Sequence, residues 1–217
     1  MNGINQFNLH LRARIQPILW YGYPTTNDYY CHMDDDGVHQ NPIFRLRAGD
    51  RLLLTLFNEQ PLTSEDMNLP PMDECGSPVS TQTSSNIHFH GTHVSPHCHQ
   101  DEVVKTIVNA GQTFLFNYTI PDFQPPGLLW WHPHTYPSAM WQIAGGATGV
   151  FVIDGIDAVQ PLVRGVPERI LVFRSEPNHR TSFANPPSED ISLNFIPIID
   201  INDGYTPPTY AIKPGEV

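Results

Sequence analysis

Two pairs of histidines, each separated by a single residue, are the strongest chemical signal in the sequence. His88 and His90 lie in Asn-Ile-His-Phe-His-Gly, and His132 and His134 lie in Trp-Trp-His-Pro-His. Residues two apart in a strand point to the same face, so each pair can present two imidazoles to one metal ion or to adjacent ions. Imidazoles without a thiolate or carboxylate suit copper, zinc, nickel or iron rather than calcium or magnesium. One such pair is weak evidence, but two pairs beside apolar strands predict a metal site.

The segments that must position these histidines have the period of β-strands. Apolar and polar residues alternate along residues 7–15, as they do in a half-buried strand. Further strand-like segments, separated in several places by Gly- and Pro-containing turns, are 43–47, 51–57, 87–93, 102–108, 113–120, 127–132 and 148–153. Many short strands joined in this way predict an all-β, Greek-key sandwich or barrel.

The remaining segments fit the same architecture. Proline accounts for 22 of the 217 residues, which disfavours helices and favours strands and ordered loops. We expect one short helix at 138–144, ended by two glycines, and a long loop at 59–85. Further strands are expected at 169–173, as a buried strand, and at 191–201.

Charge and hydropathy exclude several partners. The chain has 11 Lys and Arg against 22 Asp and Glu, a formal charge of -11. Such a surface repels phosphate, so nucleic acid and anionic membranes are poor partners. No apolar run is long enough to span a bilayer, and no signal peptide is visible at the start of the sequence. The compartment stays open on these grounds.

The two motifs and their surroundings resemble the first domain of the multicopper oxidases, a family that includes laccases, bilirubin oxidases and spore-coat oxidases. The resemblance rests on HFHG, on PPGLLWWHPH about forty residues later, and on AGGATGVFVI. The earlier NPIFRLRAGDRLLLTLFNE resembles the strand–turn–strand segment that precedes HxHG in the family. The later PERILVFR and PTYAIKPGEV resemble the opening of a second cupredoxin domain.

The resemblance implies a role for each histidine of the motifs. His88 would bind a type 2 copper, and His90, His132 and His134 would bind the paired type 3 coppers. These four supply half of the eight imidazoles of a trinuclear cluster that reduces dioxygen to water. The electrons arrive singly from a type 1 copper that oxidises the substrate.

The family's C-terminal motifs are not found in this sequence. They carry the other four cluster ligands and the type 1 site, whereas only His179 follows His134 here. The resemblance therefore implies a missing C-terminal cupredoxin domain or a partner subunit. Whether the chain is a fragment, a split subunit or a truncated product is open, as are its oligomeric state and its reducing substrate, which could be a phenol, a bilirubin-like compound or a metal ion. Relatives suggest an extracytoplasmic or secreted location, with the cytoplasm as the alternative.

Between the two motifs lies the segment His97-Cys98-His99, which reproduces the core of the type 1 motif without its last histidine. Solvated loop histidines, a free thiol at Cys98 and an accessory metal site with His93 are the three interpretations considered. The chain has three cysteines, so at least one is unpaired within it; a Cys31–Cys75 disulfide is an option that spacing does not establish.

One carboxylate is a candidate for the catalytic machinery. Relatives often carry an acid near Asp101, which would supply protons for oxygen reduction through water. The alternative is that Asp101 simply ends a polar loop. We expect most of Trp130, Trp131 and Trp141 to pack as core around the ligand strand, and Met140 to pack on the helix rather than bind copper.

We therefore expect a cupredoxin-like Greek-key domain at residues 1–157, containing both motifs, followed at 158–217 by the beginning of a second, truncated one. The predicted function is the N-terminal part of a copper-dependent oxidase. The alternative is a non-catalytic copper-binding cupredoxin module, inactive by itself because the type 1 site is absent. Degenerate, purely structural histidines are the third option, which retention of both motifs disfavours.

Overall fold

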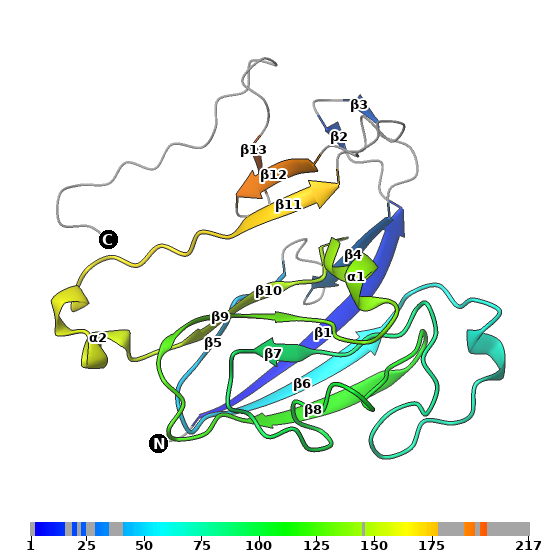
Figure 1. Ribbon diagram of the computed structural model, residues 1–217, viewed down its shortest axis with the longest axis horizontal. Coiled ribbons are helices and arrows are strands. Elements are labelled where there is room, and N and C mark those ends of the chain that lie inside the picture. The colour runs from blue at the N-terminus through cyan, green and yellow to red at the C-terminus, as the bar shows by residue number, and fades with distance from the viewer. Residues whose placement is uncertain are drawn as a thin grey trace.

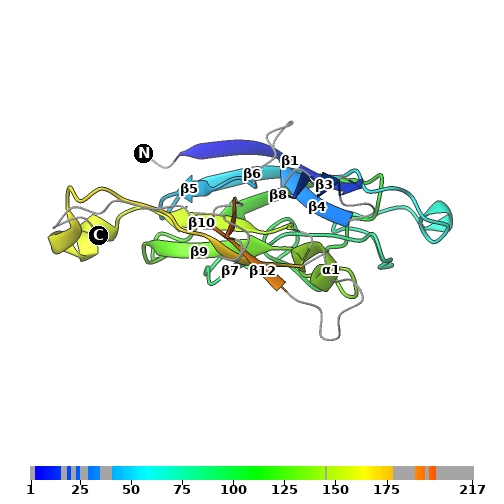
Figure 2. The same cartoon turned by 90° about the horizontal axis from the view of Figure 1, so that it is seen from above.

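The structure is a computed structural model that describes residues 3–15, 19–20, 23–24, 29–34, 41–144, 146–177, 189–193 and 196–198. Two four-stranded sheets pack face to face, which Figure 2 shows as two layers seen from above. The all-β sandwich expected from the alternating pattern is therefore confirmed. The segment 201–217, which carries part of the family resemblance, lies outside the described residues.

The first sheet has the strand order β4-β1-β6-β8 (Figure 1). Its strands are β1 (Ile4–Ile15), β4 (Tyr29–Asp34), β6 (Arg51–Asn58) and β8 (Thr113–Thr119). Strand β6 runs parallel to β1 and antiparallel to β8. Alternate side chains of β6 are buried, because a strand directs successive side chains to opposite faces of the sheet.

The second sheet carries both histidine motifs. Its order is β5-β10-β9-β7, with β5 (Phe44–Leu46), β10 (Gly149–Ile153), β9 (Gly127–His132) and β7 (His88–His90). Strand β9 is antiparallel to both of its neighbours, and β10 is parallel to β5. The two motifs, 42 residues apart between His90 and His132, thus lie on adjacent strands.

The core fills the space between the two sheets. It combines aliphatic and aromatic side chains, and the largest that are fully buried are Phe44, Phe89, Phe116, Tyr118, Trp131 and Phe151. Phe89 stacks on Phe151 with ring centroids 4.8 Å apart. Each Å² of apolar surface that these rings remove from water stabilises the fold by about 25 cal/mol. The strands that carry the histidines are therefore fixed by the aromatic residues beside them.

Smaller elements lie outside the sandwich. The two helices are α1 (Ala139–Ala144), close to the predicted 138–144, and α2 (Ile156–Val159). The short 3-10 turns are η1 (Asp66–Asn68), which interrupts the long loop at 59–85, and η2 (Pro161–Val163). A hairpin pairs β2 (Leu19–Trp20) with β3 (Tyr23–Pro24). A third sheet contains β11 (Phe173–Pro177), β12 (Glu189–Leu193) and β13 (Ile196–Ile198). Among the described residues, no helix has the length and hydropathy needed to cross a bilayer.

Two of the predicted strands are wrong. Residues 102–108 form turns and a single bridge, because the Glu102 carboxylate accepts the backbone N–H groups of residues 104–106 and closes a local turn instead of a ladder. The strand predicted at 169–173 begins only at Phe173, which is largely exposed rather than buried. An apolar run alone does not show whether another layer covers it.

One glycine of β10 makes room for the ligand strand. A Cβ added at Gly149 would lie 2.3 Å from Cε2 of Trp131, the fully buried ring directly opposite it on β9. We expect Gly149→Ala to lower the free energy of unfolding by about 1–3 kcal/mol, because the indole must leave its packed position. Chemical denaturation of the two proteins measures this difference.

Gly127→Ala is the matched control. Gly127 lies at the other end of the same strand pair, opposite Ile153, and an added Cβ there would meet nothing within 4 Å. We expect its stability to stay within about 0.5 kcal/mol of the wild type, or to rise slightly. Equal stability of the two variants would contradict the packing argument.

Candidate metal centre

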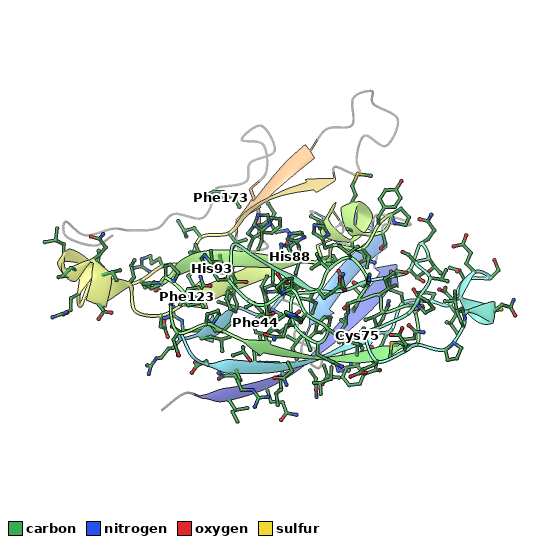
Figure 3. All side chains as sticks on the ribbon, turned by 60° about the horizontal axis from the view of Figure 1, so that its bottom comes forward. Phe44, Cys75, His88, His93, Phe123 and Phe173 are labelled. Atoms are coloured by element: carbon green, nitrogen blue, oxygen red, sulfur yellow. A yellow bond between two sulfur atoms is a disulfide. The ribbon has the colours of Figure 1, made fainter. Side chains whose placement is uncertain are left out.

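The register between β7 and β9 brings the two histidine motifs together. His88 is opposite His132, Phe89 is opposite Trp131 and His90 is opposite Trp130. Since directly opposed residues share a face, Phe89 and Trp131 point into the core while the histidines lie on the outer face of the sheet. Figure 3 shows His88 on this side of the sandwich and Phe44 in its core.

Three of the four predicted ligands form a compact group. One ring nitrogen of each of His88, His90 and His132 lies within 4.8 Å of the others. Nδ1 of His90 is 3.3 Å from Nε2 of His132. Among the described residues, this is the one group of three His, Cys, Asp or Glu side chains close enough to hold a metal ion.

His134 lies beside this triad rather than within it. Its ring centroid is 5.3 Å from that of His88 and 5.9 Å from that of His132. It follows the end of β9, after Pro133, and its side chain is exposed. The structure therefore gathers the four predicted imidazoles on one face, with three of them at the spacing of a shared ion.

Hydrogen bonds on the far side of two rings leave the opposite nitrogens available. Nδ1 of His88 donates to the Asp101 carboxylate, at 3.0 and 2.9 Å from its two oxygens. Nδ1 of His132 donates to the backbone carbonyl of Pro133 at 2.8 Å. Such partners fix the tautomer and the orientation of a ligating imidazole, so Nε2 of each ring has the lone pair that can bind a metal; Nε2 of His132 faces Nδ1 of His90.

Electrostatics keep the most buried of these rings neutral. Burial lowers the pKa of His132 to about 4; the Pro133 carbonyl opposes this shift, and the nearby rings of His88, His90 and His134 reinforce it. A neutral imidazole is the form that donates a lone pair to a metal ion. At neutral pH, therefore, no proton has to leave His132 before it can bind a metal.

Asp101 does more than end a polar loop. Besides His88, its carboxylate accepts the backbone N–H of Phe89 at 3.1 Å, so it holds both the ring and the main chain of the first motif. Its own backbone N–H donates to Ser95 across the loop at 3.0 Å. Asp101 thus contacts a predicted metal ligand directly.

The tryptophans divide between the two faces. Trp131 is fully buried, as expected for core, and its indole N–H donates to the Pro42 carbonyl at 3.3 Å. Trp130 is 40% exposed and stacks on His132 with ring centroids 4.1 Å apart, and on His90 at 5.1 Å. The side chain of Trp141 lies outside the described residues.

The packing predicted for Met140 is wrong, because its side chain is 64% exposed.

Of the three interpretations of the loop histidines, the accessory metal site is not formed. His93 faces Gln124 and Phe123, His97 bonds to Ser95, and His99 stacks on Phe114 while bonding to the Leu115 carbonyl. The three rings therefore point to different partners and make no metal-binding group. Their contacts are those of ordinary loop side chains.

Cys98 is neither a free thiol nor a ligand, because it forms a disulfide with Cys75. This bond overturns the Cys31–Cys75 option, and the side chain of Cys31 lies outside the described residues. Cys75 lies on the long loop at 59–85 (Figure 3), so the disulfide joins this loop to the one that carries Asp101.

Asn86, which no sequence motif singled out, is also part of the site. It is fully buried two residues before His88, and its side-chain oxygen accepts the backbone N–H of His134. An asparagine two residues before a ligand motif could have suggested a supporting role. Its hydrogen-bond partners, however, are 17 to 48 residues away in the chain. Only the fold brings them into contact.

Comparison with known proteins finds a family model that matches part of the chain. Residues 80–157, which contain both histidine motifs, match the family model for multicopper oxidases. The resemblance seen in the sequence is therefore confirmed for this part of the chain. No curated protein sequence matches the chain.

Solved structures share the fold. A laccase from Pediococcus acidilactici Pa5930 superposes with a TM-score of 0.58 and 17% identity, over 89% of this chain and 38% of that one. A copper nitrite reductase from Nitrosomonas europaea gives 0.53 and 20%, over 88% and 56%. A multicopper oxidase from Campylobacter jejuni gives 0.47 and 21%, over 70% and 26%. The superpositions on the laccase and the nitrite reductase support a cupredoxin-like sandwich. The chain spans less than two thirds of each of the three proteins.

The disulfide gives a direct chemical test. Both cysteines fall within one tryptic peptide, residues 52–105, so the unreduced peptide should be lighter by two hydrogen atoms than its reduced form in mass spectrometry. Because the bond closes a loop with a sequence separation of 23, replacing both cysteines by serine should cost about 3 kcal/mol of unfolding free energy. Identical masses before and after reduction would contradict the pairing.

Proposed function

We propose that this chain is the N-terminal part of a multicopper oxidase that contributes half of the ligands of a trinuclear copper cluster. Residues 1–157 would form the first cupredoxin domain and 158–217 the beginning of the second. The observation that carries the proposal is the group of three imidazole nitrogens within 4.8 Å on the outer face of the β9–β7 strand pair.

The donor set fits copper. All members of the group are imidazoles, which suit copper, and the described residues add no cysteine to it. His88 and His132 each have one ring nitrogen occupied by an oxygen acceptor and the other facing the group. We assign His88 to the type 2 position and His90, His132 and His134 to the type 3 pair, as the family resemblance implies.

Copper bound at these residues would supply one-electron transfer from a substrate and the four-electron reduction of dioxygen to water. The chain's own contribution is to hold the imidazoles in place. Asp101 orients the ring of His88, and the Pro133 carbonyl orients that of His132. Trp130 stacks against the rings of His90 and His132. Four imidazoles on one outer face leave the opposite side of the site to be completed by other residues, for which we propose a C-terminal cupredoxin domain or a partner subunit.

The cellular location is part of the same proposal. A disulfide between two surface loops is typical of proteins that mature in an oxidising compartment. This bond supports the extracytoplasmic or secreted location over the cytoplasmic alternative.

Copper titration of the purified chain tests the ligand assignment. We expect weak, substoichiometric copper with a type 2 signal in electron paramagnetic resonance, no blue absorption band, and no oxidation of an aryl diamine. His132→Ala should abolish this binding, because His132 is the central, buried member of the triad. His97→Ala, which removes a loop histidine outside the triad, should bind copper as the wild type does.

Each other outcome changes the conclusion in a defined way. Absence of copper binding, or equal loss in the two variants, would overturn the assignment. A full complement of copper with oxygen consumption would show that copies of this chain complete the cluster by themselves. Tight binding of one type 2 copper that does not change when a C-terminal cupredoxin domain is added would favour the non-catalytic copper-binding module.

The role of Asp101 as a proton donor stays a prediction from the resemblance. Its contacts with His88 and Phe89 support a positioning role. We expect Asp101→Asn to retain copper while changing the hyperfine pattern of the type 2 signal, because the amide presents a donor as well as an acceptor to Nδ1 of His88. An unchanged spectrum would argue against contact between Asp101 and a copper ligand.

A further inference from the structure

A single buried side chain connects the two histidine motifs. The carboxamide oxygen of Asn86 accepts the backbone N–H of His134 at 2.7 Å. Its nitrogen donates to the carbonyls of Val103 at 3.1 Å and Thr106 at 3.0 Å. The side chain is fully buried, and its orientation is unambiguous because the carbonyls require donors and the N–H requires an acceptor.

The two carbonyls belong to a turn that begins directly after Asp101. The Glu102 carboxylate accepts the backbone N–H groups of Val104 and Lys105 at 3.1 and 2.8 Å, and also that of Thr106. Asn86 binds the carbonyls of Val103 and Thr106 in the same turn. The position of this turn, and so of Asp101 beside it, is therefore set relative to Asn86.

We propose that Asn86 is a positioning residue that sets the separation between His88 and His134. The Asn86 carboxamide nitrogen binds the turn that follows Asp101, and Asp101 binds the ring of His88. The carboxamide oxygen of Asn86 binds the main chain of His134 directly. The centroids of the two rings lie 5.3 Å apart, a separation that two ligands of one cluster have to keep. This inference rests on the proposed function of the four histidines.

A merely structural role is the competing explanation, and the chain contains a matched example of one. Asn58 is also buried, and its nitrogen donates to the carbonyls of Thr83 and Val108, both at 2.7 Å, while its oxygen accepts the backbone N–H of Gln60. None of these partners is a predicted ligand or contacts one through Asp101. Loss of Asn58 should therefore affect stability alone.

The experiment compares the same substitutions at the two positions. Asn86→Asp keeps the acceptor for His134 and removes both donors to the turn, whereas Asn86→Leu removes all three bonds at similar volume. Asn58→Asp and Asn58→Leu are the controls. We expect the Asn86 variants to bind copper roughly 10–100-fold more weakly than their controls, with an altered type 2 spectrum, at comparable losses in thermal stability. Equal copper affinities at the two positions would overturn the proposal.

A copper-free measurement separates this inference from the proposed function. In the metal-free protein, imidazole nitrogen resonances should shift for His88 in Asn86→Asp and for both His88 and His134 in Asn86→Leu, and should not shift in the Asn58 variants. If Asn86→Leu does not fold, Asn86→Asp alone carries the test. Wild-type protein that binds no copper would refute the proposed function. Unshifted resonances in a folded Asn86 variant would refute the positioning role.

Discussion

The antiparallel pairing of β7 with β9 is the constraint on which the candidate metal centre depends. Because side chains alternate along both strands, one register places His88, His90 and His132 on the outer face and Phe89 and Trp131 in the core. A slip of one residue in either strand would exchange these faces, burying imidazoles and exposing aromatic rings. The hydrophobic effect on the inner face thus enforces the geometry of the chemical face.

Contacts from the loops then orient the histidine rings that the sheet places on one face. The turn closed by Glu102, the Asp101 carboxylate and the Asn86 carboxamide connect the region after the first motif to the main chain of the second. The disulfide between Cys75 and Cys98 attaches this region to the long loop at 59–85. The core therefore fixes the strands and the face on which the imidazoles lie, and polar contacts orient the individual rings.

The clustering of imidazoles has an electrostatic consequence. Burial lowers the pKa of His132 to about 4, and the neighbouring rings of His88, His90 and His134 add to this shift against the Pro133 carbonyl. The same arrangement favours a bound cation, since imidazole nitrogens from three side chains lie within 4.8 Å of one another. A sheet face that carries this cluster, with Trp130 stacked against it, differs from the ordinary polar exterior of a sandwich.

By itself the sequence determined the sandwich, the positions of most of its strands, the short helix at α1 and the four histidines, because period-2 alternation and His-x-His spacing are local properties of the chain. The strand predicted at 102–108 is wrong because a side-chain carboxylate competes for the backbone N–H groups. The burial predicted at Phe173 is wrong because exposure depends on what covers the strand. Only the tertiary structure decided that Cys98 pairs with Cys75, that Asp101 bonds to His88 and that Asn86 bonds to His134. Each of these contacts joins residues 13 to 48 positions apart, and local patterns contain no information on which distant groups the fold will bring within hydrogen-bonding distance.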